Sequence, residues 1–310
     1  MGQRLSDLSR KLSAVLVRVD GIDQAKFRVP RVLQKAHAFD RLVRPALHIQ
    51  GIWAHCFGFH FAVADADMHK NTNNNVEVLA RMLDSVHQKL GGLPRTVTLI
   101  QDNTARECKN SKILKFFIKL KALDILDHAH LGYPEKGHTH GPLDATYGQC
   151  CVKIANSEFQ DPSEVVDILQ GFLDEAALDP GTSQNKQAYK LDESADWEAW
   201  WDEVDLRMSQ LTGPEAPHWF HICSRKDLSL GPSLTAGVCI ELGNLSGHGC
   251  DIHSRRCLAA LLLPRFRRNG GSADMLAWRS SPWPRGRGGG SVRPHGQLEA
   301  APGGAVNPWR

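Results

Sequence analysis

"LSAVLVRVD", from Leu12 to Asp20, is an apolar, β-branched segment that ends on an acidic residue. Such a segment is typical of a strand buried inside a sheet, and Gly21 directly after it marks the end of that strand. "TVTLIQD", from Thr96 to Asp102, repeats the pattern in a shorter form. The sequence therefore predicts two interior strands, each with a carboxylate at its C-terminal end.

The segments around these two predict an alternation of strands and helices. "KFRVPRV", which begins at Lys26, indicates a second strand, with Pro30 suited to a strand end. Residues 46–65 indicate one or two more strands around Gly51 and Gly58. Apolar periodicity and capping residues predict helices at Asn71–Leu90, Ser111–Leu123 and Asp144–Ala155, and a strand at Ile125–Tyr133. The order is strand, strand, strand, helix, strand, helix, strand, helix, which is the order of the ribonuclease H fold, an α/β fold with a mixed sheet.

Three parts are expected along the chain. Residues 12–160 form the ribonuclease H-like core, residues 161–260 a helical or mixed extension that packs on it, and residues 264–310 a disordered tail rich in Arg, Gly and Pro. In the extension we expect amphipathic helices at Pro162–Leu178 and Ala195–Leu211 and a short strand at His218–Cys223. The tryptophans Trp197, Trp200 and Trp201 either pack against the core or stack on bases.

The composition indicates a globular protein. The chain has 310 residues, of which 42% are hydrophobic, and its net charge of +3 says little about nucleic acid. Its eight cysteines show no C-x-x-C spacing, so a reduced compartment fits better than a disulfide framework. No apolar run approaches the roughly 18 residues of a membrane span. We expect an intracellular protein, nuclear or cytoplasmic, that has no membrane partner.

Three acids are candidates for a metal site. In a ribonuclease H fold the first and fourth strands are neighbours, so Asp20 and Asp102 would converge, and Asp144 stands on the helix after the fifth strand. In-line attack on a phosphodiester develops charge on the attacking and leaving oxygens together, and two Mg²⁺ (or Mn²⁺) ions held by hard oxygen ligands stabilise both. The sequence therefore predicts Asp20, Asp102 and Asp144 as catalytic metal ligands.

Three blocks carry a resemblance to a known family: "VDGIDQAKFRVPR", "QDNTARECKNSKILKFF" and "GHTHGPLDATYGQ". Together they resemble the transposase-derived, ribonuclease H-like DDE-type proteins, over roughly Val15 to Ala155 and more weakly through Cys223. The resemblance implies a catalytic core related to transposases and integrases, with its three acids at Asp20, Asp102 and Asp144. Asp23 takes the place of Asp20 as metal ligand if the first strand runs on to it.

Polar residues beside these acids have two interpretations each. Asn103, Lys109 and Asn110 follow the second acid at the start of a helix, where they would position a phosphate, or where Asn110 would simply cap the helix. His140 is a candidate metal ligand or proton donor to the leaving oxygen, whereas His138 more plausibly holds the loop. A zinc site with His130 is the weaker alternative, because soft ligands are missing nearby.

The sequence thus favours metal-dependent cleavage or strand transfer on DNA, by a protein that acts alone or as a homo-oligomer. The alternative is a domesticated or decayed transposase core that binds nucleic acid or protein without catalysis. A ribonuclease on the same fold is a third possibility, since fold does not determine function. A separate DNA-binding module is not recognisable in the sequence, which suggests a fragment or a further subunit.

Overall fold

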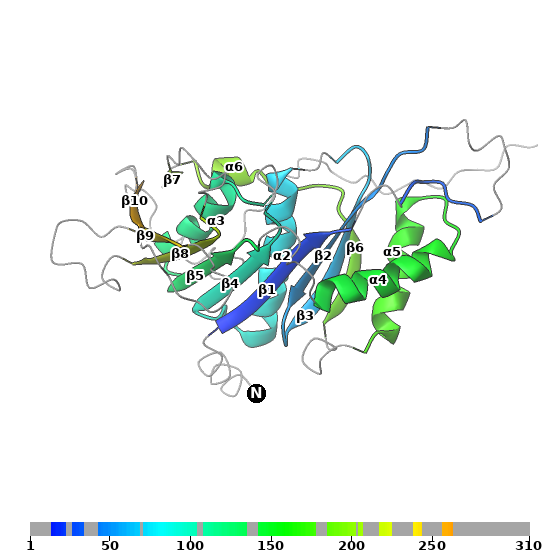
Figure 1. Cartoon of the computed structure of the whole chain (residues 1–310), viewed down its shortest axis with the longest axis horizontal. Coiled ribbons are helices and arrows are strands. Elements are labelled where there is room, and N and C mark those ends of the chain that lie inside the picture. The colour runs from blue at the N-terminus through cyan, green and yellow to red at the C-terminus, as the bar shows by residue number, and fades with distance from the viewer. Residues whose placement is uncertain are drawn as a thin grey trace, which may run out of the picture.

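The computed structural model describes residues 14–22, 27–33, 43–68, 71–103, 108–134, 142–177, 185–202, 204–206, 217–224, 238–243 and 256–262. Within these residues the chain forms an α/β fold around one mixed sheet (Figure 1). The predicted α/β class is therefore confirmed. The tail predicted at 264–310 lies outside the described residues.

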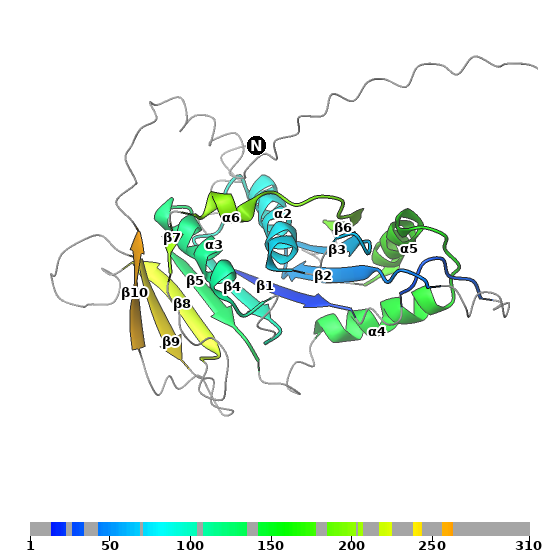
Figure 2. The same ribbon diagram turned by 90° about the horizontal axis from the view of Figure 1, so that it is seen from above.

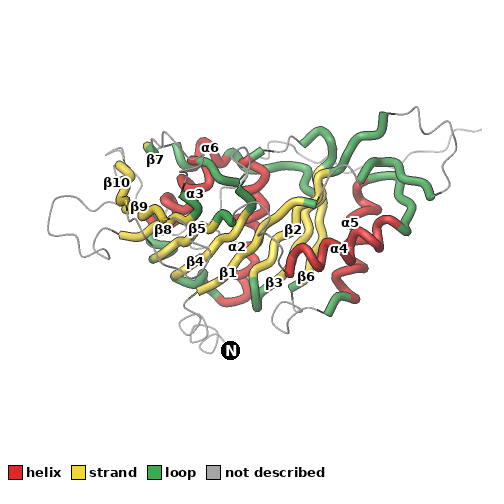
Figure 3. Tube along the Cα trace, viewed as in Figure 1, coloured by secondary structure: helices red, strands yellow, loops and turns green. Residues whose placement is uncertain are grey.

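The sheet runs in the order β6-β3-β2-β1-β4-β5-β8-β9-β10-β7. Its first seven strands form the main part, and the last three continue it at one end (Figure 3). The strands are β1 (Ala14–Gly21), β2 (His48–Ala54), β3 (Gly58–Ala64), β4 (Thr96–Gln101), β5 (His128–Gly132), β6 (Lys186–Lys190), β7 (Val204–Asp205), β8 (Trp219–Ser224), β9 (Val238–Gly243) and β10 (Arg256–Leu262).

The strand directions around β1 define the centre of the sheet. β1 is antiparallel to β2 and parallel to β4, while β2 is antiparallel to β3 and β4 is parallel to β5. β6 then adds to β3 in parallel, and β8 adds to β5 antiparallel. Strands from beyond residue 160, the predicted core boundary, therefore extend the five central strands at both edges, next to β3 and next to β5.

β1 shows why its sequence suits an interior strand. Val15, Val17 and Val19 are buried on one face, whereas Arg18 and Asp20 are half-buried on the other. β4 alternates in the same way, and the parallel register places its buried residues beside those of β1. Because side chains alternate between the two faces of a strand, both strands present the same face to the main core.

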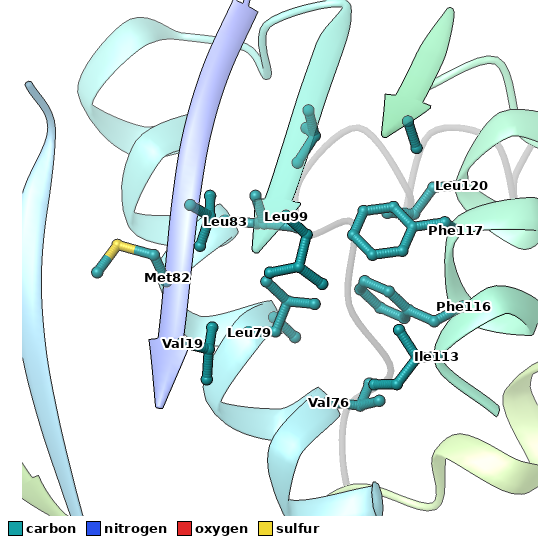
Figure 4. Packing of buried hydrophobic residues seen from close by; sticks show 14 of the residues in the cluster. Val19, Val76, Leu79, Met82, Leu83, Leu99, Ile113, Phe116, Phe117 and Leu120 are labelled. Atoms are coloured by element: carbon teal, nitrogen blue, oxygen red, sulfur yellow. The ribbon is translucent and has the colours of Figure 1, made fainter. Parts of the chain in front are cut away.

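Three helices cover that face: α2 (Thr72–Leu90), α3 (Ser111–Ala122) and α6 (Trp197–Trp200) (Figure 2). Leu79 from α2 and Phe116 and Phe117 from α3 meet Val19 and Leu99 from the strands in this core (Figure 4). The Asn71 side chain caps α2 by accepting a hydrogen bond from the Asn74 N–H. The tryptophans of the α6 segment pack here, with Trp197 and Trp201 buried, so the packing interpretation is confirmed.

The opposite face is covered only in part. α4 (Pro142–Ala155) and α5 (Pro162–Glu175) pack there on β2, β3 and β6, and form a second core. This core contains Ile49, Phe59, Phe61, Tyr147, Cys150, Leu169 and Phe172. Among the described helices, none lies over β4, β5 and β8 on this face (Figure 2).

Two predicted elements were wrong. The strand at "KFRVPRV" is a pair of isolated bridges, Arg28 to Ala46 and Arg31 to Phe159, and both β2 and β3 come from residues 46–65 instead. Pro30 has no N–H to donate, which breaks a ladder at this point. The helix predicted at Ala195–Leu211 is the short α6, followed by β7, because Val204 pairs with Leu262 of β10. Residues 203 and 207–211 lie outside the described part.

His60 makes the stability of the fold depend on pH. It is 2% exposed in β3, and burial lowers its pKa from 6.5 to about 4, against an opposing hydrogen bond with Asn185. Between these two pKa values the unfolded chain binds a proton that the folded chain does not, so stability falls as the pH drops from about 6.5 to 4. The loss is on the order of 3 kcal/mol for this group.

His60→Gln is therefore expected to reduce the pH dependence of stability. It should lower the melting temperature at pH 7.5, since packing is lost, yet narrow the difference between pH 7.5 and pH 5 relative to the wild type. Thermal unfolding of both proteins at the two pH values measures this. If the melting temperature falls equally in the variant and the wild type between pH 7.5 and pH 5, other groups cause the acid sensitivity.

Candidate active site

Asp20 stands near the end of β1 and Asp102 directly follows β4, and the alternation of side chains along the two strands assigns both acids to the same face of the sheet. Val19 of β1 pairs with Gln101 of β4, and each strand continues with its aspartate. Neighbouring strands are about 4.8 Å apart, so the two backbone positions are adjacent. Both carboxylates are half-buried and accept a hydrogen bond from the next N–H, at 2.8 Å from Gly21 and at 2.6 Å from Asn103.

Asp144 is joined to this edge through Tyr147. Asp144 stands in the first turn of α4, and Tyr147, one turn later, donates a hydrogen bond from its hydroxyl to the backbone carbonyl of Asp20 at 2.5 Å. Residues three apart share a helix face, so Asp144 lies on the side of α4 that carries the tyrosine. Burial raises the pKa of the Tyr147 phenol, and the negative charges of Asp20 and Asp144 raise it further.

Gly51 makes room for this contact. The Gly51 N–H donates to the Tyr147 hydroxyl at 3.1 Å, and a Cβ atom added at Gly51 would lie only 2.5 Å from that oxygen. The phenol thus bridges β1, β2 and α4. Sequence reasoning singled out neither Gly51 nor Tyr147 for the site, although the tyrosine at helical spacing from Asp144 was a visible signal.

Buried amides support the strand ends from the opposite face. Gln50 of β2 and Gln101 of β4 both donate to Asn75 Oδ1 on the first turns of α2, at 2.9 and 3.4 Å. Asn75 in turn donates to the sulfur of Cys108 at 3.5 Å. Gln101 precedes Asp102, so this network holds the backbone from which the carboxylate extends. Sequence reasoning missed it, because separate Asn and Gln residues carry no spacing signal.

Asn110 and Lys109, which follow Asp102 in the sequence, make contacts at the start of α3. Asn110 caps α3 by accepting hydrogen bonds from the Lys112 and Ile113 N–H groups, at 3.0 and 3.2 Å, so the capping interpretation is confirmed. Lys109 is 3% exposed, its ammonium lies 5.9 Å from the centroid of the Tyr133 ring, and burial lowers its pKa. A role of Lys109 in positioning phosphate stays a prediction.

The remaining site residues separate into two groups. His130 lies on β5, where its ring stacks on His221 with centroids 4.4 Å apart. Asp23, His138 and His140 lie outside the described residues.

The candidate ligands of a divalent ion are carboxylates. Asp20, Asp102 and Asp144 offer carboxylate oxygens, the donors that Mg²⁺ and Mn²⁺ prefer. Across the described ranges, however, no three His, Cys, Asp or Glu side chains gather closely enough to hold a metal ion. The acids Asp20 and Asp102 offer the donor chemistry of a divalent cation, and the Tyr147 hydroxyl connects α4, which carries Asp144, to the Asp20 backbone.

Fold and site define an α/β protein with a mixed sheet and a carboxylate pair at the C-terminal ends of two central strands. Residues 39–230 match a family described as a domain of unknown function (DUF7869), and the chain belongs to this family. The matched range contains Asp102 and Asp144 and leaves β1, with Asp20, outside it. No curated protein matches the chain.

Of the helices in the described ranges, none has the length and apolar character to cross a membrane. Within the same residues Cys56, Cys108, Cys150, Cys151 and Cys223 are free thiols.

Proposed function

We propose that this protein is a DDE-type nuclease or strand transferase that acts on DNA, with a ribonuclease H-like core. Asp20 and Asp102 would hold a divalent cation, and Asp144 would be the third ligand. The cation, when bound, supplies stabilisation of the charge that develops on the attacking and leaving oxygens of the phosphodiester. The observation that carries the proposal is the placement of Asp20 and Asp102 at adjacent strand ends on one face.

The topology supports this proposal. The central strands have the order β3-β2-β1-β4-β5, with β2 antiparallel to its neighbours and β4 and β5 parallel to β1. This is the arrangement expected of a ribonuclease H-like sheet. In an open sheet with parallel strands, ligands bind beyond the carboxyl ends of the strands, which is where both acids stand.

The local contacts support the roles of individual residues. The two N–H groups that bind the Asp20 and Asp102 carboxylates orient them without neutralising their charge. Tyr147 holds α4 against the end of β1, which keeps Asp144 on the side of the pair. The chain's own residues would thus fix the ligand positions before the substrate binds, which lowers the cost of reorganisation during the reaction.

The proposal is tested by nicking of supercoiled plasmid DNA with the full chain, in Mg²⁺, in Mn²⁺ and in EDTA. Cleavage that needs either metal is the expected result, and an RNA–DNA hybrid offered in parallel distinguishes a ribonuclease. Binding of duplex DNA without cleavage in any metal would overturn the enzymatic proposal and favour the alternative, a transposase-derived binding module.

A further inference from the structure

Four rings form a row on the same sheet face as Asp20 and Asp102. His130 of β5 and His221 of β8 are directly opposite in the antiparallel register, and their rings stack at 4.4 Å with 14° between the planes. Trp219 lies 5.3 Å from His130 and 5.6 Å from His221, measured between ring centroids. His128 completes the row, with its Nδ1 3.0 Å from His221 Nε2. All four side chains are half-exposed.

The strand register connects this ring row to the carboxylate pair. Gly132 of β5 pairs with Ile100 of β4 on one side and with Trp219 of β8 on the other. Trp219 is therefore level with Ile100, which precedes Asp102 by two residues along the chain. Its strand, β8, is the second strand from β4 across the sheet. From the spacings of a regular sheet, the Cα atoms of Asp102 and Trp219 are about 12 Å apart. That span corresponds to roughly three to four nucleotides of a stacked strand.

The neighbours of the ring row on this face are mostly polar. Arg18, Thr96 and Thr98 share the face with Asp20 and Asp102, and on the far side of the row the register pairs His221 with Glu241 of β9. Gly132 lies between Ile100 and Trp219 and has no side chain, so no side chain of β5 separates the Trp219 position from the Ile100 position at this level.

A purely structural role accounts poorly for these residues. The core-facing residues of the same two strands, Ala129, Leu131, Phe220 and Ile222, are buried and already join β5 and β8 to α3. The ring row faces away from that core, and no described helix covers it. Half-exposed imidazole and indole rings in a contiguous row are instead the kind of surface on which unpaired bases stack.

We infer that the ring row binds unpaired bases of a DNA strand whose phosphodiester lies at the carboxylate pair. This inference rests on the proposed function for its choice of substrate, and it adds that the substrate is single-stranded or locally opened on that side. Trp219 is the stacking residue nearest the acids. His221 contacts all three other rings and holds the row together.

The test is binding of a fluorescein-labelled single-stranded DNA oligonucleotide, and of the matching duplex, to the full chain in EDTA. Fluorescence anisotropy without metal measures binding apart from cleavage. Trp219→Leu keeps an apolar side chain but removes the π face, and we expect roughly tenfold weaker binding of the single strand, with a smaller effect on the duplex. Trp219→Phe should restore most of the affinity.

Trp200→Leu is the matched control, because Trp200 is also half-exposed but packs on Phe116 on the opposite face. It should bind the single strand as the wild type does. Equal affinity of Trp219→Leu and the wild type would overturn the inference. A change of oligomeric state in Trp219→Leu with unchanged DNA affinity would overturn it too, since the face would then be a protein interface. Tenfold loss in EDTA would support it even if no variant cleaves DNA, and only the proposed function would then fail.

Discussion

Asp102→Asn is expected to lower metal-dependent DNA cleavage by about 10³-fold, with the fold preserved. The amide keeps an oxygen that accepts the Asn103 N–H, so the local backbone contact is retained. It lacks the negative charge that a divalent cation requires, and a bound metal contributes several kcal/mol to stabilising the transition state of phosphodiester cleavage. Initial rates of plasmid nicking at saturating Mn²⁺ measure the loss, and isothermal titration with Mn²⁺ measures the weakened binding of the ion.

Asp167→Asn provides the control. Asp167 is exposed on α5, and its substitution removes the same charge from the chain. It should nick DNA at the wild-type rate. Nicking by Asp102→Asn at the rate of this control would place the reaction elsewhere on the molecule. Asp144→Asn, measured in the same series, tests whether the third acid is also a metal ligand. If it is, the loss of nicking should be comparable to that of Asp102→Asn.

Tyr147→Phe is expected to lower both stability and turnover. The substitution removes the hydroxyl that donates to the Asp20 carbonyl and accepts from the Gly51 N–H, so a part-buried carbonyl and a buried N–H each lose a partner. Unsatisfied buried groups of this kind cost about 1–3 kcal/mol in unfolding free energy. With α4 no longer bonded to the end of β1, Asp144 loses its fixed position, and kcat should fall while KM for DNA stays nearly constant.

Tyr189→Phe is the matched comparison. The Tyr189 hydroxyl is also removed from water, and among the described residues it has no hydrogen-bond partner. Loss of that oxygen should leave stability unchanged or raise it slightly, and turnover should be that of the wild type. Chemical denaturation and nicking kinetics of the two variants give the contrast. If both phenylalanine variants behave alike, the Tyr147 contact neither stabilises the fold nor positions Asp144.

The elements that the sequence predicts correctly are those defined by local residue patterns. β1 and β4 combine an apolar, β-branched run with an acid at the end, and the helices α2 and α3 directly follow their N-cap residues Asn71 and Asn110. These segments carry enough periodicity to define an element without knowledge of its neighbours. The same patterns located Asp20 and Asp102 at strand ends.

The rest depends on contacts between distant segments. β6, with the sequence KQAYK, has no strand-like apolar pattern, and it forms because β3 offers an unpaired edge to it. The KFRVPRV segment has such a pattern and still fails to form a strand. In the site, Gly51 and Tyr147 meet across 96 residues, and the ring row joins β5 to β8 across 91 residues between His130 and His221. A single sequence carries no sign of such pairings.

The position of β6 and β8 on either flank of the sheet limits how the protein can be shortened. A piece ending near residue 160 would retain all three acids and lose both of these strands. β3 and β5 would then present bare backbone N–H and C=O groups along apolar strands, a ready template for self-association. Minimal fragments designed around the acids alone should therefore precipitate, whereas fragments that extend through Leu262 keep β3, β5 and β8 paired.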